Sequence, residues 1–127
     1  MPDTSPSRVL IVDDEPGIVT AIEFLMQQHG FVTETAYHGA DALTKIGPFD
    51  PQLVILDVSM PRMDGFEVAL EIRKQPHFQD ISIVFLTARG TESDKLKGYG
   101  SGADRYMTKP FDNHELVRIV QDMLERW

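Results

Sequence analysis

Five polar side chains follow short apolar runs at four separate places in the chain, where the strands of a sheet would end. A carboxylate in that position is costly unless it has a task, because a hydrophobic strand offers it little solvation. Brought together, three carboxylates, a hydroxyl and an amine could hold a divalent cation and a phosphoryl group. The five residues are Asp13, Asp14, Asp57, Thr87 and Lys109.

The apolar runs are predicted to be strands. The run 53–56 before Asp57 contains no polar residue, which is typical of a parallel strand that is covered on both faces. The run 31–36 alternates well enough to predict a partly exposed strand. The predicted strands are Arg8–Val12, Phe31–Ala36, Leu53–Asp57, Ile83–Leu86 and Arg105–Met107.

Helices are predicted between these strands. Pro16 begins the first helix, where a missing N–H costs nothing, and Gly30 ends it as a C-terminal cap. Gly47 and Pro48 are expected to end the second. The predicted helices are the segment from Pro16 to Gly30, Ala40–Ile46, Phe66–Lys74, Glu92–Tyr99 and Asn113–Arg126.

Strands that alternate with helices predict an α/β fold, in which helices cover both faces of a parallel sheet. Right-handed crossovers then place the strand-to-helix loops at one edge, outside the carboxyl ends of the strands. The candidate residues would therefore meet there. A chain of 127 residues is long enough for one domain. We expect that domain over residues 8–127, with residues 1–7 as a flexible tail.

Composition excludes several other classes of protein. Hydrophobic residues make up 42% and charged residues 25% of the chain, as in soluble globular proteins. Cysteine is absent, which excludes disulfides and thiolate metal sites. The net charge of −8 without a basic cluster argues against direct binding to nucleic acid. No apolar stretch has the length of a membrane span, and we expect a cytoplasmic protein.

The three aspartates favour a hard divalent cation. Like charges at adjoining strand ends repel one another and raise the pKa of at least one carboxyl group. Mg²⁺ suits carboxylates, carbonyls and retained waters, with Mn²⁺ as the alternative cation, whereas zinc prefers histidine or cysteine. The four histidines show no ligand spacing and are expected at the surface: His29, His38, His77 and His114.

Asp57 could also act as a nucleophile. A carboxylate that attacks phosphorus forms an acyl phosphate, and such a transfer depends mostly on positioning and charge neutralisation. In this interpretation Lys109 supplies a positive charge and the Thr87 hydroxyl supplies a hydrogen bond.

Ordinary structural roles are the alternative for each residue. Asp13 or Asp14 could cap the helix that begins at Pro16, and Thr87 could cap the next helix. Lys109 before a proline could be an exposed turn residue. Because all of them are expected at one edge of one sheet, a common site is the better explanation.

Four stretches of the chain together carry a family resemblance. They are Val9–Glu15, Leu56–Gly65, Leu86–Ala88 and Gly102–Phe111. In these motifs the chain resembles the receiver domain of two-component response regulators, over about residues 8–126. The resemblance implies a flavodoxin-like (βα)5 fold, with a five-stranded parallel sheet in the order 2-1-3-4-5 and helices on both faces.

The resemblance also implies roles for the site residues. Asp57 would be the phosphoacceptor, which receives a phosphoryl group from a sensor histidine kinase or a histidine phosphotransfer protein. Asp14 and Asp57 would bind Mg²⁺ through their side chains, Ser59 through its backbone carbonyl, and Asp13 through water. Lys109 would contact the phosphoryl group.

A switch is the second implication of the resemblance. Thr87 would form a hydrogen bond to the incoming phosphoryl group, and Tyr106 would then turn inward. This would alter the surface of the fourth helix, fifth strand and fifth helix, which carries the output. The alternative for Tyr106 is a half-buried strand aromatic without a switching role. Pro110 would be a cis proline that aims Lys109, and Gly65 would shape the loop beside the site.

The sequence leaves the output partner or effector domain unidentified. Asp104 and Lys95 or Lys97 resemble charges that form a symmetric dimer in one subfamily. Arg118, however, lies one residue away from the expected spacing. A phosphorylation-dependent homodimer therefore stays open.

The predicted function is a signalling switch that catalyses only its own phosphorylation and dephosphorylation. A small Mg²⁺-dependent phosphohydrolase with Asp57 as nucleophile would need a second aspartate two residues later, where Ser59 stands. A flavodoxin-like cofactor-binding module would need a glycine-rich or hydroxyl-rich phosphate loop, whereas the loop after Val12 is acidic. A receiver that has lost its acceptor site would lack a key residue, and none is missing.

Overall fold

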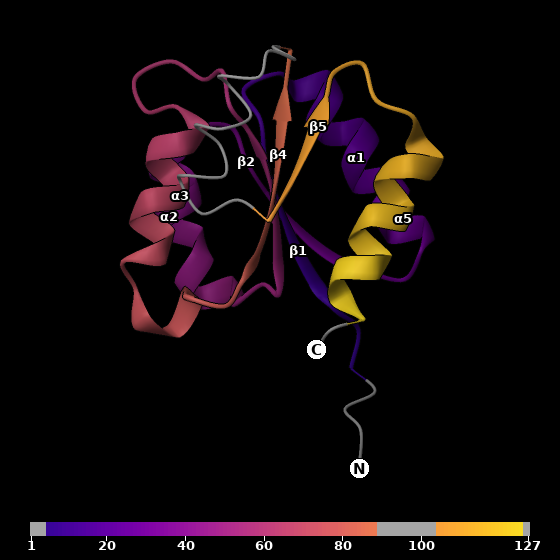
Figure 1. The fold of residues 1–127 in the computed structure, drawn as a ribbon, viewed down its shortest axis with the longest axis horizontal. Coiled ribbons are helices and arrows are strands. Elements are labelled where there is room, and N and C mark those ends of the chain that lie inside the picture. Colours follow the sequence, from indigo (N-terminus) through magenta and orange to yellow (C-terminus); the bar gives the residue numbers. More distant parts are fainter. Residues whose placement is uncertain (1–4, 89–103, 126–127) are drawn as a thin grey trace.

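The described residues form one parallel sheet of five strands between two layers of helices (Figure 1). The computed structural model describes residues 5–88 and 104–125, so the helix predicted over Glu92–Tyr99 lies outside it. The strands are β1 Arg8–Val12, β2 Val32–Ala36, β3 Leu53–Asp57, β4 Ser82–Thr87 and β5 Arg105–Thr108. Their order is β2-β1-β3-β4-β5, and every pairing is parallel. The predicted α/β flavodoxin-like fold is confirmed, including its strand order.

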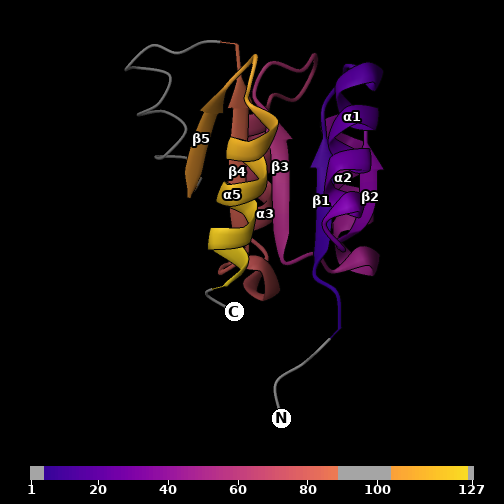
Figure 2. The same ribbon diagram turned by 90° about the vertical axis from the view of Figure 1, so that its right-hand side faces the viewer.

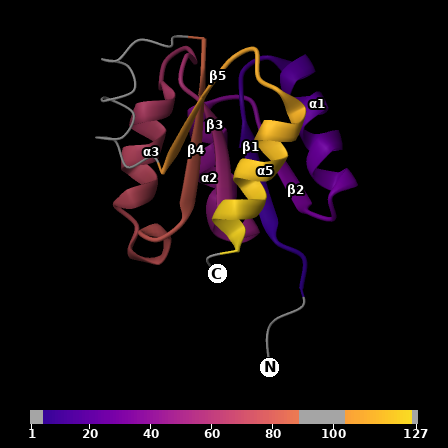
Figure 3. The same cartoon turned by 45° about the vertical axis from the view of Figure 1, so that its right-hand side comes forward.

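Helices cover both faces of this sheet. α1 and α5 lie on one face, which is turned toward the viewer in Figure 2, and α2 and α3 lie on the other, as Figure 3 shows. None of the described helices combines the length and the apolar character that crossing a bilayer requires. The described helices are α1 Pro16–Gln28, α2 Gly39–Phe49, α3 Gly65–Arg73, the short 3-10 helix η1 Pro76–Phe78, and α5 Asn113–Leu124.

Alternate residues of the strands enter two separate hydrophobic cores. Leu10 and Val54 pack in the core formed with α2 and α3. Val9 and Ile55 pack in the core formed with α1 and α5. All of β3 is buried, as its apolar sequence predicts. Full burial of one large aliphatic side chain stabilises the fold by about 1.5–3 kcal/mol. Packing on both faces therefore holds these strands, and the residues that follow them, in place.

α2 continues through the residues predicted to end it. It extends from Gly39 to Phe49 with Pro48 inside, so the prediction that Gly47 and Pro48 end this helix is wrong. A proline normally clashes with the Cβ of the helical residue before it, but Gly47 has no Cβ. Pro48 also stands in the last turn, where its missing N–H removes a single hydrogen bond. Asp50 ends the helix in the left-handed conformation, with φ 51°.

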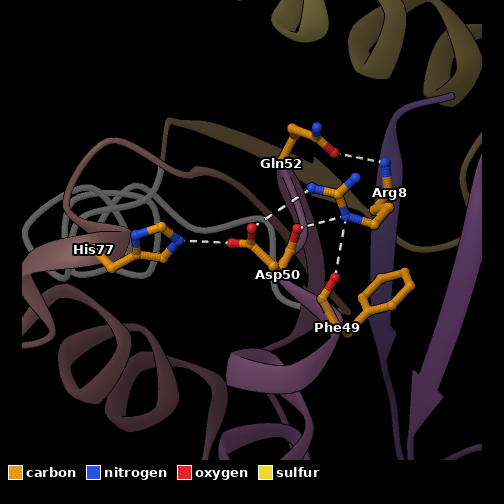
Figure 4. Close-up of polar contacts among 5 residues, drawn as sticks. All are labelled: Arg8, Phe49, Asp50, Gln52 and His77. Carbon is orange, nitrogen blue, oxygen red and sulfur yellow. Dashed lines mark hydrogen bonds and ion pairs between the residues drawn. The ribbon is translucent and has the colours of Figure 1, made fainter. Parts of the chain in front are cut away.

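One arginine links two segments at the amino edge of the sheet, opposite the predicted site (Figure 4). Arg8 Nε donates to the backbone carbonyls of Phe49 (3.1 Å) and Asp50 (2.8 Å), and the Arg8 backbone N–H donates to Gln52 Oε1 (2.6 Å). Asp50 Oδ1 lies 2.8 Å from His77 Nε2 in η1. These contacts hold together the chain segments that lead into β1, β3 and β4.

Arg8→Ala should therefore lower stability without affecting the opposite edge. Loss of the donors leaves two backbone carbonyls without this partner, and the expected decrease in unfolding free energy is about 1–3 kcal/mol. Urea unfolding measures it, with Arg118→Ala on the exposed side of α5 as the control. Unchanged stability of Arg8→Ala would show that the contacts in Figure 4 are not structural anchors.

Candidate functional site

The structure brings the predicted residues together at the carboxyl edge of the sheet. Asp13 follows β1, Asp57 and Thr87 are the last residues of β3 and β4, and Lys109 follows β5. Lys109 Nζ lies 2.7 Å from Asp13 Oδ2 and 3.3 Å from Asp57 Oδ1. The Lys109 amine thus contacts two buried carboxylates at the ends of β1 and β3, and neither of these strands pairs with β5.

Three carboxylates converge beside this lysine. Oxygen atoms of Asp13, Asp14 and Asp57 lie within 4.8 Å of one another. Asp13 is 0% and Asp57 is 2% exposed, and Asp14 is the most exposed of the three. An all-oxygen set of this kind fits a hard divalent cation such as Mg²⁺, which also retains several waters. The donor chemistry of the site therefore matches the predicted cation.

The negative charge in this cluster exceeds what one lysine neutralises. The pKa of Asp57 is raised from 3.8 to about 7: burial makes the largest contribution, the negative charge of Asp13 adds to it, and Lys109 partly opposes the shift. Burial lowers the pKa of Lys109, but the hydrogen bond and charge of Asp13 and the charge of Asp57 more than compensate, so its pKa is raised overall. Lys109 consequently stays protonated, and a bound cation would relieve the repulsion between the carboxylates.

The loop after β3 packs closely against the backbone of the site. A Cβ on Gly65 would overlap the Asp57 carbonyl oxygen and lie 2.9 Å from Val58 Cα. Asp64 begins α3 beside it, because the Asp64 side chain accepts a hydrogen bond from Glu67 N (3.0 Å). Ser59 belongs to the same loop, and its backbone N–H lies 3.4 Å from Asp57 Oδ1. Gly65 thus allows the helix to begin directly against the end of β3.

The two residues proposed for switching are adjacent to the site. The backbone carbonyl of Thr87, a fully buried residue, accepts a hydrogen bond from Lys109 N (2.6 Å). Tyr106 is half-buried and lies opposite Phe85 on the neighbouring strand. The two rings meet edge to face, with centroids 6.3 Å apart. The Lys109–Pro110 peptide bond is cis, as the sequence motif implies.

Glu15 is a site residue that the sequence reasoning assigned no role. Its Oε1 lies 3.5 Å from Lys109 Nζ, and its side chain is 62% exposed. It occupies the N-cap position of α1 without a side-chain capping bond, so neither aspartate is the cap. Asp13 Oδ1 instead accepts the Glu15 backbone N–H at 2.9 Å. The sequence feature that could have indicated its contact with the site is the run of three consecutive acidic residues after β1.

Two other expectations concern residues outside this cluster. The four histidines are all exposed, as predicted. Asp104, proposed for a dimer contact, is engaged within its own chain: its Oδ2 lies 3.2 Å from Arg73 Nη2 and accepts the Ile83 N–H at 2.9 Å. Lys95 and Lys97 lie outside the described residues. The homodimer itself stays a prediction.

A parallel flavodoxin-like sheet with an acidic site at its carboxyl edge defines the structural class. The family model of the response regulator receiver domain matches residues 9–121, and the chain belongs to this family. It is 38% identical over 122 residues to the response regulator Rre1 of Synechocystis sp., covering 95% of this chain and 53% of that protein. The transcriptional regulatory protein TrcR of Mycobacterium tuberculosis is 38% identical over 124 residues, covering 98% of this chain and 48% of that protein.

Solved structures agree with this assignment. A putative response regulator from Chloroflexus aurantiacus superposes with a TM-score of 0.90 and 34% identity, covering 94% of this chain and 98% of that one. The chain spans about half the length of the curated relatives it matches. Receiver domains are signalling domains that bind Mg²⁺ in an acidic pocket and interact with histidine kinases or phosphotransfer proteins.

Gly65→Ala should distort the site. The added methyl group meets backbone rather than flexible side chains, so we expect a loss of about 1–3 kcal/mol in unfolding free energy and weaker Mg²⁺ binding. Urea unfolding and calorimetric Mg²⁺ titration measure the two effects. Gly17→Ala is the matched control, because a Cβ there meets nothing within 4 Å. Parent-like behaviour of Gly65→Ala in both assays would contradict the close approach.

The metal-free protein should lose stability as the pH rises. The pKa of Asp57 is about 7 in the folded chain and 3.8 ordinarily, so the folded state binds more protons between these values. Unfolding free energy therefore falls as pH rises from about 4 to 7. Asp57→Asn removes this contribution to the slope and should be more stable than the parent at pH 8, by on the order of a few kcal/mol.

Urea unfolding in EDTA between pH 4.5 and 8 measures this difference. Asp122→Asn, an exposed carboxylate on α5, is the control and should follow the parent. Mg²⁺ added at pH 8 should narrow the difference in unfolding free energy between the parent and Asp57→Asn, because it binds the folded state of the parent and not its unfolded state. Parallel pH profiles for the parent and Asp57→Asn would show that the Asp57 carboxyl group is not destabilised by its surroundings.

Proposed function

We propose that this chain is a phosphorylation-dependent switch in which Asp57 receives a phosphoryl group from a sensor histidine kinase or a histidine phosphotransfer protein. The observation that carries the proposal is the position of Asp57. It is a 2% exposed carboxylate at a strand end, 3.3 Å from a lysine amine and beside two further carboxylates. No ordinary cap or turn role accounts for that combination.

The transfer is a displacement at phosphorus. An oxygen of Asp57 attacks the phosphorus atom, a new P–O bond forms, and the P–N bond to the donor histidine breaks with its electron pair leaving on the imidazole nitrogen. Asp57 must be ionised to attack, and Lys109 favours its ionised form. The high pKa of Asp57 without metal implies that charge neutralisation at the site activates the nucleophile.

Asp13, Asp14 and Asp57 would hold Mg²⁺, with the Ser59 backbone carbonyl as a further ligand and Asp13 acting through water. The bound cation would neutralise charge on the carboxylates and on the phosphoryl oxygens. Lys109 would donate to the phosphoryl group once it is attached to Asp57. Because Lys109 Nζ already lies 3.3 Å from Asp57 Oδ1, the lysine is close to the atom that would carry the phosphoryl group.

Thr87 and Tyr106 would transmit phosphorylation to the surface formed by β5 and α5. The predicted fourth helix, which the resemblance adds to this surface, lies outside the described residues. The Thr87 hydroxyl would bind the phosphoryl group, and the Tyr106 ring, which already packs edge to face against Phe85, would turn further inward. The added charge would shift the equilibrium between two ways of packing the same elements, in favour of the active one. A shift from 1:99 to 99:1 requires about 5.5 kcal/mol of differential stabilisation.

The remaining parts of the proposal concern extent and surroundings. We place the receiver at residues 8–127, since β1 begins at Arg8 and the family match begins at residue 9. We expect a cytoplasmic protein that performs no reaction beyond its own phosphorylation and dephosphorylation. Its output would pass through an unidentified partner or an effector domain.

Intact-mass analysis after incubation with Mg²⁺ and phosphoramidate tests this function. The parent should gain one phosphoryl group, because a free nucleophilic carboxylate and a neutralising cation are both present. EDTA or Asp57→Asn should abolish the gain, whereas Asp122→Asn should retain it as the control. If the parent gains no phosphoryl group although calorimetry shows bound Mg²⁺, Asp57 is not an acceptor and the proposal fails.

A further inference from the structure

Glu15 places a third carboxylate on Lys109, at the rim of the site. Asp13 and Asp57 contact the same amine from inside and have side chains only 0% and 3% exposed. The Glu15 side chain is 62% exposed, and its Oε1 lies 3.5 Å from Lys109 Nζ. Glu15 is thus the most exposed of the three described carboxylates that contact this lysine.

The backbone of Glu15 is held firmly while its side chain has no other described partner. Its N–H donates to Asp13 Oδ1 (2.9 Å), and its carbonyl accepts from Ile18 N and Val19 N (both 3.1 Å). The side chain makes no capping bond to α1, and it is not part of the three-aspartate cluster. The fixed backbone therefore keeps one exposed negative charge beside Lys109, and none of its described contacts gives that charge a structural task.

A negative charge at this position acts on any donor that approaches Asp57. Phosphoryl donors are anions, and Glu15 both repels them and attracts the positive charge of Lys109. Repulsion between two unit negative charges roughly 7 Å apart in water slows the reaction of the donor with Asp57 about threefold. Salt screens such an exposed interaction over about 10 Å at 0.1 M ionic strength. The repulsion should thus grow with the net negative charge of the donor.

We propose that Glu15 is a specificity-determining residue that selects phosphodonors by charge. It slows transfer from free dianionic donors relative to donors whose phosphoryl group is attached to a positively charged nitrogen. This inference rests on the proposed phosphoacceptor function of Asp57. In both cases a P–O bond to Asp57 forms. With acetyl phosphate the bond to the acetate oxygen breaks, and with phosphoramidate the P–N bond breaks and ammonia leaves.

The test compares Glu15→Gln with the parent on two donors of different charge. Acetyl phosphate is a dianion at neutral pH, whereas phosphoramidate carries a positive nitrogen and one net negative charge. Initial rates of mass gain are measured for each donor at one fixed Mg²⁺ concentration and at low and high salt. Glu125→Gln, an exposed carboxylate after α5, is the matched control, and urea unfolding confirms that each variant folds.

Glu15→Gln should accelerate transfer from acetyl phosphate about threefold or more, and transfer from phosphoramidate by a smaller factor. The ratio of the two rates should therefore change about two- to threefold at low salt, return toward the parent ratio at high salt, and stay unchanged in Glu125→Gln. An equal effect on both donors, no effect, or an effect insensitive to salt would overturn selection by charge. If the parent accepts phosphate from neither donor, the proposed function itself fails, which is a distinct result.

Discussion

The structure depends on one electrostatic constraint: Lys109 is shared by more carboxylates than it can neutralise. Asp13 and Asp57 are buried beside it, and burial together with the charge of Asp13 raises the pKa of Asp57 to about 7. Such an arrangement persists only if the surrounding fold holds the carboxylates in place against their repulsion. Two hydrophobic cores do this, since β1 and β3 are packed on both faces immediately before these residues.

Each edge of the sheet has one position where the side chain is decisive: Gly65 at the carboxyl edge must have none, and Arg8 at the amino edge needs its long side chain. Gly65 lets α3 begin against the end of β3, so that the loop carrying Ser59 stays close to Asp57. At the other edge, Arg8 joins β1 to the segment before β3 through the carbonyls of Phe49 and Asp50. The edge that carries the chemistry is therefore electrostatically strained, and the opposite edge is tied by satisfied hydrogen bonds.

Strand ends were predictable from sequence, because apolar runs fix both the strand and the polar residue that follows it. Asp57 and Thr87 are examples. The end of α2 was not predictable in this way, since the effect of Pro48 depends on the missing Cβ of Gly47. The contact of Glu15 with Lys109 was not predictable for another reason. This contact joins loops that are 94 residues apart, and no local pattern indicates which of three consecutive acids will face that lysine.

The contact between Lys109 and Thr87 connects the charge imbalance to the rest of the sheet. The Lys109 backbone N–H binds the Thr87 carbonyl at the end of β4, and β4 pairs with the strand that carries Tyr106. A phosphoryl group on Asp57 would redistribute the Lys109 amine among its partners, close to that backbone link. Because packed side chains such as Phe85 and Tyr106 favour discrete arrangements, a small shift at the lysine can select between packings instead of deforming the sheet gradually. Under the proposed function, the repulsion among the carboxylates of the unphosphorylated site would then also supply part of the energy for switching.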